Sequence, residues 1–409
     1  MRTIASFYIA FMLPFMLHAQ EFGFSISDDK EKAEIPFSLH SNLVVIPLVL
    51  NNRLPLKFIL DTGVRNAILT EKVYSDILGI PYAKRYTIRG VGGVKLVEAY
   101  VTMEVSLSLP GVEGQGQTML VLEEDYIELR NFMGTDVHGM LGYELFNRFV
   151  VSINYQKKQL TLINRETFKP KRNYQQIPIT IEDTKPYISL PVVFDDGSVF
   201  QSKLLVDTGA SHGLLLDPES DENIKIPEAT IDANIGRGLG GDIEGQIGRI
   251  KSLQIDRHLL SDVVVSYPYP DSYLDSLTSS NVFRHGSIGG EILSRFNVVF
   301  DYQNEKMYIK KNASFRKPFF YNLSGITLKA KGSQLNVFEV SEVRPSSYAA
   351  KSGLQTGDII YSVNGVLARH LELRTINGFF NSKPKKKIRL VVVRDGEIKK
   401  FMFRLENAI

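Results

Sequence analysis

The feature that most constrains this chain is a pair of Asp-Thr-Gly triplets in matching surroundings. They occupy residues 61–63 and 207–209, and a lysine with three apolar residues precedes each one. A second short apolar run follows shortly after each triplet, at 67–69 and 214–216. One triplet arises easily by chance, but repeated flanks do not. The pattern indicates one site built from two half-sites, each supplying a carboxylate.

The duplication extends beyond the triplets. His138–Phe149 aligns without gaps on His285–Phe296, and Arg89–Gly93 matches Arg237–Gly241. These blocks are co-linear with the triplets at a nearly constant offset, which is typical of an internally repeated domain.

Asp61 and Asp207 are the candidate catalytic residues. Two carboxyl groups about 3 Å apart cannot both ionise, so they share one proton and titrate as a coupled pair. The ionised member can take a proton from a bridging water, while the protonated member donates a hydrogen bond to a carbonyl oxygen. Such a pair makes water a nucleophile toward an amide without a metal, cysteine or serine.

The neighbours of the aspartates are expected to support the catalytic loops. Gly63 and Gly209 permit a tight turn directly after each acid. Thr62 and Thr208 supply hydroxyls that can hydrogen-bond across the junction and hold the two loops in register.

Each copy resembles the clan of aspartic proteases that includes pepsins and retroviral proteases. The shared pattern is apolar-apolar-Asp-Thr-Gly, a glycine-containing flap and apolar-apolar-Gly, here Met140–Gly142 and Ser287–Gly289. The resemblance covers roughly residues 40–312 and implies a fused, single-chain version of the retroviral dimer. It implies an aspartic endopeptidase, with a peptide or protein substrate and no cofactor, in a mainly β fold of two pseudo-symmetric β-barrel lobes. The implied flap residues are Gly90, Val91, Gly92 and Gly93 in one copy and Gly238, Leu239, Gly240 and Gly241 in the other.

The first triplet departs from the family pattern. Val64 and Arg65 follow it, where the second copy has Ala210 and Ser211 as these families do. A cation at Arg65 would lower an aspartate pKa if it pointed toward the pair. An inactive peptide-binding or scaffold protein that keeps the protease fold is therefore the alternative function. His138 and His285, beside the last motif, are interpreted as hydrogen-bonded structural residues.

Composition excludes several other chemistries. The chain has no cysteine, which excludes thiolate zinc sites, cysteine proteases and disulfides. Its seven histidines form no HExxH pair, so we expect no metal site, and no GxSxG elbow or Walker A loop is present.

Residues 1–20 are predicted to be a signal peptide. Arg2 precedes an apolar stretch from Ile4 to Leu17, and Ala19 offers a small residue for cleavage. The stretch is shorter than the roughly 20 residues of a membrane span and contains Pro14. Export to the periplasm, the outer surface or the medium is thus favoured over a membrane anchor. No other segment is apolar enough to span a membrane.

The remaining organisation is predicted from strand patterns. Alternation such as that of Thr102–Leu107 indicates half-buried strands. We expect lobe 1 at residues 21–165 and lobe 2 at 175–312, joined by a basic, proline-containing connection. One chain then carries both half-sites, which predicts a monomer.

The last part of the chain, residues 320–409, resembles a PDZ domain of α+β fold. The resemblance rests on two segments. Ser346–Ile360 reads as a short helix ending in Gly and followed by Gly-Asp, and Tyr361–Gly365 contains Val-Asn-Gly. PDZ domains bind a peptide by adding it as a strand to a sheet edge. By position the peptide-binding residues are expected to be Ser333, Gln334, Leu335, Asn336 and Val337. The partner could be a C-terminus, an internal segment or the chain's own protease.

The basic run Lys383–Lys387 is interpreted as a solvated loop, since nucleic acid is a poor partner for an exported protein.

Overall fold

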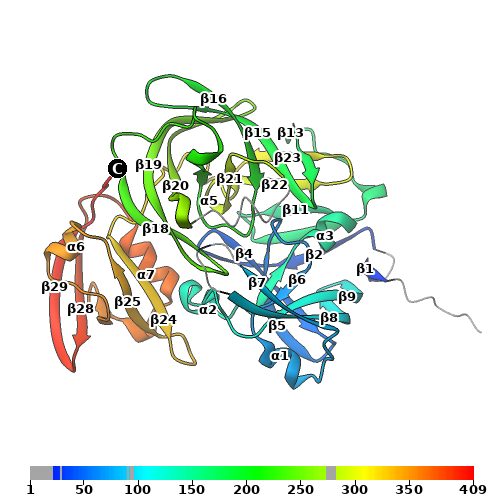
Figure 1. The fold of residues 1–409 in the computed structure, drawn as a ribbon, viewed down its shortest axis with the longest axis horizontal. Helices are drawn as coiled ribbons and strands as arrows, with labels where there is room; N and C mark the ends of the chain where they lie inside the picture. Colours follow the sequence, from blue (N-terminus) through cyan, green and yellow to red (C-terminus); the bar gives the residue numbers. More distant parts are fainter. Residues whose placement is uncertain (1–21, 28–29, 90–91, 93–95, 273–281) are drawn as a thin grey trace, which may run out of the picture.

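A computed structural model describes residues 22–27, 30–89, 92, 96–272 and 282–409. The predicted signal peptide and the flap residues Gly90, Val91 and Gly93 lie outside these residues. The chain forms two β lobes and a smaller β-rich domain at one end (Figure 1). The mainly β fold predicted from the sequence is confirmed.

Lobe 1 is one strongly mixed sheet. Its strands run in the order β1-β9-β6-β10-β5-β4-β8-β7, with β3 paired to β4. The elements are β1 Gly23–Ile26, β3 Ser38–His40, β4 Leu43–Leu50, β5 Leu54–Leu60, β6 Ala67–Leu69, α1 Lys72–Ile77, β7 Lys84–Arg89, β8 Leu96–Leu109, β9 Val112–Leu122, α2 Leu129–Met133, β10 Gly139–Leu141 and α3 Tyr143–Arg148.

Lobe 2 repeats the same topology. Its sheet order is β14-β15-β16-β21-β17-β20-β19-β18, so β15, β16, β17 and β21 correspond to β4, β5, β6 and β10. In both lobes the strand before the aspartate runs parallel to the strand of the last motif. The elements are β14 Thr180–Glu182, β15 Lys185–Val193, β16 Val199–Val206, β17 Leu214–Leu216, β18 Ile231–Gly238, β19 Gly241–Ile255, β20 His258–Pro268, β21 Gly286–Ile288 and α5 Gly290–Leu293. The predicted duplication is therefore a duplication of folds.

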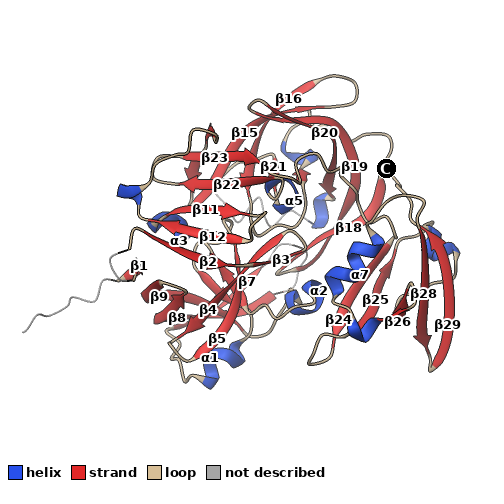
Figure 2. Ribbon diagram, turned by 180° about the vertical axis from the view of Figure 1, so that it is seen from behind, coloured by secondary structure: helices blue, strands red, loops and turns tan. Residues whose placement is uncertain are grey.

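A third sheet joins the lobes beneath the aspartates. It has the order β13-β23-β22-β11-β12-β2, and the junction is the antiparallel pair of β11 with β22 (Figure 2). The strands are β2 Lys32–Pro36, β11 Val150–Asn154, β12 Gln159–Ile163, β13 Gln175–Pro178, β22 Phe296–Asp301 and β23 Lys306–Lys311. The hairpins β11–β12 and β22–β23 thus pair with each other.

Aromatic packing consolidates this junction. Phe146 of α3 in lobe 1 is fully buried and stacks on Tyr302, with ring centroids 5.2 Å apart. It meets Phe300 of β22 edge to face at 5.4 Å. Burying a phenylalanine contributes about 1.5–3 kcal/mol, so α3 helps to fix the lobes to each other. One hydrophobic core runs through both lobes and the joining sheet.

The C-terminal domain has its own core and a five-strand path with the order β24-β25-β26-β28-β29. Its elements are β24 Ile326–Lys331, β25 Val337–Val343, α6 Tyr348–Lys351, β26 Ile359–Val363, β27 Val366–Leu367, α7 Leu373–Phe380, β28 Lys387–Arg394 and β29 Glu397–Arg404. Short 3-10 turns at Arg165–Thr167, Pro218–Ser220 and Ala368–His370 complete the chain.

The predicted peptide-binding residues of this domain need correction. Ser333, Gln334, Leu335 and Asn336 form the turn between β24 and β25, and Val337 begins β25. Strand β25 pairs with β24 on one side and β26 on the other, so it has no open edge. Strand β24 lies at the end of the sheet and pairs with β25 on one side, so its other edge is free. Helix α7 packs against this strand. A peptide added as a strand would therefore pair with Ile326–Lys331.

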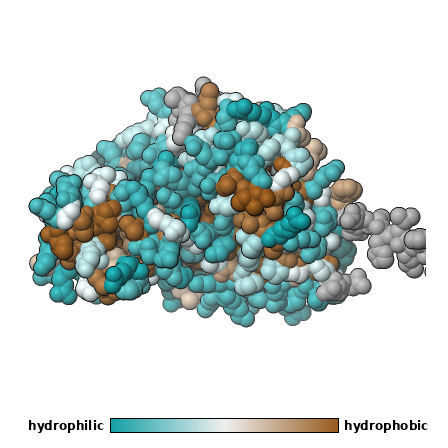
Figure 3. Space-filling view, turned by 90° about the horizontal axis from the view of Figure 1, so that it is seen from below, coloured by the Kyte–Doolittle hydropathy of each residue, from teal (hydrophilic) through white to brown (hydrophobic). Residues whose placement is uncertain are grey.

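The surface is mostly polar on the face shown in Figure 3, with apolar residues gathered over the C-terminal domain and over the two β lobes. Helix α1 adds exposed apolar side chains, Val73 and Ile77. Within the described ranges, no helix has the length and hydropathy needed to cross a membrane.

Candidate active site

The two Asp-Thr-Gly loops meet at the junction of the lobes. Strand β5 delivers Asp61, whose backbone N–H donates to the carbonyl of Leu141, 2.9 Å away. Strand β16 delivers Asp207 in the same way, with its N–H 2.9 Å from the carbonyl of Ile288. The last motif of each copy, Met140–Gly142 or Ser287–Gly289, therefore holds the backbone of the aspartate, which explains why it repeats with the triplet.

The threonines hold the two loops together by reciprocal hydrogen bonds. The backbone N–H of Thr62 donates to Oγ1 of Thr208 at 3.1 Å, and the N–H of Thr208 donates to Oγ1 of Thr62 at 3.0 Å. Each hydroxyl then donates to a carbonyl of the opposite lobe, Thr62 to Val206 at 2.6 Å and Thr208 to Leu60 at 2.7 Å. All four bonds are buried, so the loops are fixed in register.

The carboxylates converge on the glycines that follow them. The N–H of Gly63 donates to Oδ1 of Asp61 at 2.7 Å, and the N–H of Gly209 donates to Oδ1 of Asp207 at 2.9 Å. A Cβ placed on Gly209 would lie 2.2 Å from Cγ of Asp61, and one on Gly63 would lie 3.6 Å from Oδ1 of Asp207. Asp61 thus lies against the loop of lobe 2, where only glycine leaves room for it, and Asp207 lies at contact distance from Gly63 of lobe 1.

Burial and mutual repulsion give the site an unusual acid. Asp61 is buried, and burial together with the charge of Asp207 raises its pKa from 3.8 to about 7. The N–H of Gly63 and the charge of Lys185 act in the opposite direction. The pair can therefore hold a proton at neutral pH, which is the state that aspartate-based water activation requires.

Lys185 is a further candidate site residue, which the sequence patterns did not reveal. It begins β15, and it lines a cavity of about 340 Å³ together with Gly63 and Val64 of the first catalytic loop. Burial lowers the pKa of Lys185, and the neighbouring charge of Arg284 lowers it further. Lysine begins a strand here without any motif, so only the folded topology brings it near Asp61.

The Arg65 side chain does not point toward the aspartates. Its guanidinium forms an ion pair with Asp183, in the turn between β14 and β15 of the other lobe. The Arg65 side chain is 59% exposed, so this pair lies at the solvent rim of the cavity. Arg65, which departs from the family pattern, thus has its ion-pair partner in the other lobe.

The two flaps meet at Gly92 and Gly241. A Cβ placed on Gly92 would lie 2.1 Å from the carbonyl oxygen of Gly241, so the two tips touch. Gly238 pairs with Gly241 where β18 turns into β19, and Leu239 packs on a small cluster of lobe 1 that includes Val97. Gly240 lies in the same turn.

His138 and His285 are structural. The N–H of Lys57 donates to Nδ1 of His138 at 3.0 Å, and the N–H of Lys203 donates to Nδ1 of His285 at 2.8 Å. Burial lowers the pKa of both imidazoles, which favours the neutral form that can accept these bonds. They anchor the strands that lead to the aspartates.

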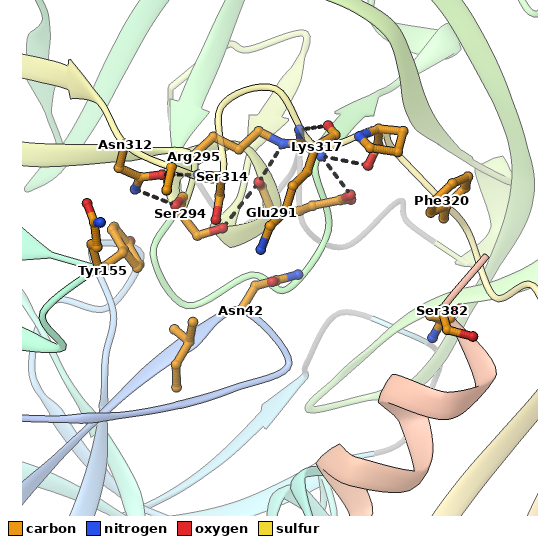
Figure 4. A pocket seen from close by; sticks show the side chains of 15 residues that line it. Asn42, Tyr155, Glu291, Ser294, Arg295, Asn312, Ser314, Lys317, Phe320 and Ser382 are labelled. Carbon is orange, nitrogen blue, oxygen red and sulfur yellow. Dashed lines mark hydrogen bonds and ion pairs between the residues drawn. The ribbon is translucent and has the colours of Figure 1, made fainter.

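A larger cavity of about 530 Å³ lies elsewhere, between the lobes and the C-terminal domain (Figure 4). Arg295 crosses it, paired with Glu291 at 3.5 Å and donating to the carbonyl of Lys317. Neither aspartate lines either cavity, but only the smaller one reaches a catalytic loop, at Gly63 and Val64. Glu291 and Arg295 are paired with each other, and residues of both lobes and of the C-terminal domain line the cavity, so we regard it as a seam between domains.

Comparison with known families agrees with this geometry. Residues 46–145 and 190–290 match the Aspartyl protease family, and residues 339–394 match the PDZ domain family. The two protease matches each contain one triplet and one last motif. No curated protein matches the chain.

Proposed function

We propose that this chain, which contains two aspartyl protease repeats and a PDZ domain, is an aspartic endopeptidase. The observation that carries the proposal is the reciprocal hydrogen bonding of Thr62 and Thr208, which brings Asp61 and Asp207 into one site. Two family repeats alone would support only the fold. A joined pair of carboxylates with one raised pKa supports the chemistry.

In the proposed reaction the pair carries one proton. The ionised carboxylate takes a proton from water, whose oxygen forms a bond to the amide carbon. The protonated carboxyl donates a hydrogen bond to the carbonyl oxygen and stabilises its developing charge. Transfer of a proton to the amide nitrogen then lets the C–N bond break. Asp61 and Asp207 act as one unit, so we assign these roles to the pair.

The flaps and the cavity support binding of an extended peptide. The tips at Gly92 and Gly241 touch in the structure, so a substrate must part them to enter. Closure over the bound peptide would exclude water and align the scissile bond. The cavity of about 340 Å³ beside Gly63 has room for one or two side chains.

The PDZ domain would recruit a substrate or a partner protein by adding a peptide to β24. We further propose that the chain acts after export and as a monomer. Residues 1–20 have the composition of a signal peptide, and both half-sites lie on one chain.

An inactive scaffold is the second candidate, because Val64 and Arg65 replace the residues usual after the triplet. The ion pair of Arg65 with Asp183 weakens this candidate, since the cation is already engaged away from the aspartates. Retaining two like charges in a buried site also costs stability without serving a scaffold.

The test is cleavage of a mixed peptide library by the full chain between pH 3 and 8. Asp61→Asn and Asp207→Asn serve as matched controls, because asparagine keeps the shape but cannot ionise. The endopeptidase is expected to cut a defined set of peptides, and both variants are expected to cut none. A parent that cleaves nothing across this range would leave the scaffold as the function.

A further inference from the structure

The edge of the PDZ sheet is covered by a segment of the protease. Helix α2 of lobe 1 packs against β24, the strand that would accept a peptide (Figures 1 and 2). The covering segment, residues 128–134, consists of Glu128, the helix and Gly134.

Charge and aromatic contacts hold this segment on β24. Lys329 of β24 lies 2.8 Å from the Glu128 carboxylate, and its ammonium lies 4.7 Å from the ring centre of Phe132. Arg130 donates to the carbonyl of Ser333, 2.9 Å away in the turn after β24. Burial raises the pKa of Glu128, but Lys329 and Arg237 outweigh it, so the pKa lies below its ordinary value.

The segment also reaches the second wall of the groove. A Cβ placed on Gly134 would lie 2.4 Å from Cβ of Leu373, the first residue of α7. Strand β24 and helix α7 are the elements between which a PDZ ligand lies. Residues 128–134 therefore contact both walls of the peptide groove.

The backbone of this segment is suited to a fixed contact. Glu128 is left-handed, with φ of 55°, a conformation that costs a residue with a Cβ about 1 kcal/mol or more. The strain places its carboxylate between two cations, Lys329 and Arg237.

The second cation belongs to the flap of lobe 2. Arg237 lies in β18, next to Gly238 at the flap tip, and its Nη2 is 3.2 Å from Glu128. Its guanidinium also lies 5.5 Å from the centre of the Phe132 ring. Glu128 and Phe132 thus contact the PDZ edge strand and the flap arm at the same time.

We propose that residues 128–134 mask the PDZ groove and restrain the lobe 2 flap, and that an acidic peptide displacing them from β24 frees the flap and accelerates cleavage. This rests on the proposed function. The peptide must replace what it displaces, so it carries a carboxylate for Lys329 and a large apolar side chain in place of Phe132.

The first test uses the full chain and the variant Lys329→Glu, which sets two carboxylates against each other at the masked edge. Amide hydrogen exchange in residues 326–331 is expected to rise at least tenfold, and kcat/KM for a cleaved peptide to rise several-fold. Lys351→Glu is the matched control, because it makes the same charge change on α6 of the PDZ domain. It should alter neither quantity.

The double variant Glu128→Lys/Lys329→Glu separates masking from restraint. It restores an opposite-charge pair at the groove but sets two cations together at Arg237. Exchange in residues 326–331 should return toward that of the parent, while kcat/KM should remain raised. If kcat/KM instead returned with the exchange rate, the link through Arg237 would be refuted.

The third test uses a synthetic peptide with the sequence of residues 126–136 as the ligand of the PDZ domain. Added to the full chain, it should raise both exchange at 128–134 and kcat/KM, and a copy with lysine at the position of Glu128 should do neither. Unchanged exchange in Lys329→Glu would overturn the masking. A parent that cleaves nothing refutes the proposed function and the acceleration, while the exchange results still decide the masking by themselves.

Discussion

Replacing Thr208 by valine should weaken the junction of the lobes more than any similar change at the surface. The variant keeps the side-chain shape but loses the hydroxyl that accepts from the N–H of Thr62 and donates to the carbonyl of Leu60. Both partners are buried and would be left without these bonds. An unsatisfied buried polar group costs about 1–3 kcal/mol, so the expected loss is roughly 2–6 kcal/mol.

The measurement is a urea unfolding series on the parent, Thr208→Val and Thr208→Ser. Serine keeps the hydroxyl and loses one methyl group, so it should cost only about 1 kcal/mol. Peptide cleavage measured on the same samples should fall sharply in Thr208→Val, because the two aspartates lose their common register. Equal unfolding midpoints for the valine and serine variants would refute the reasoning, since the hydroxyl would then contribute nothing.

Three further outcomes are expected. Asp61→Asn should stabilise the fold, since the pKa of Asp61 is raised to about 7 and its ionisation destabilises the native state. In chemical denaturation, the free energy of unfolding of Asp61→Asn should equal that of the parent below pH 4. It should exceed the parent value increasingly as the pH rises to 7 and beyond, by about 4 kcal/mol at most; a difference that shrinks with rising pH would contradict this sign. Lys185→Met should move the alkaline limb of the pH–kcat/KM profile to higher pH, because Lys185 lowers the pKa of Asp61; an unmoved limb would remove Lys185 from the site. Gly209→Ala should lower kcat at least 100-fold, because its Cβ would lie 2.2 Å from Cγ of Asp61; near-parent turnover would show that the loops can separate.

The sequence was sufficient for the parts of the site that repeat. Asp61 and Asp207 could be paired because the same motif occurs twice in matching surroundings and because water activation without a metal needs two carboxylates. The structural role predicted for His138 and His285 is confirmed by the hydrogen bonds that they accept from the backbone N–H groups of Lys57 and Lys203. The alternation of Thr102–Leu107 also predicted a strand, and these residues lie in β8.

What the sequence did not reveal depends on contacts between elements distant in the chain. Lys185 reaches the site only through the packing of β15 beside the first loop. The PDZ groove was placed at Ser333–Val337 because strand order inside a sheet is not readable from alternation, and the free edge is β24. The contact of Glu128 with Lys329 joins residues of two domains, and no local pattern encodes it.

The central claim is that Asp61 and Asp207 act as a single unit. Its most direct test compares kcat/KM on the best library peptide for the parent, Asp61→Asn, Asp207→Asn and the double variant, at the parent's optimal pH. Residues that act together are not additive, so each single variant should lose as much activity as the double. A single variant that retains substantial activity, or losses that multiply in the double variant, would contradict a shared catalytic pair.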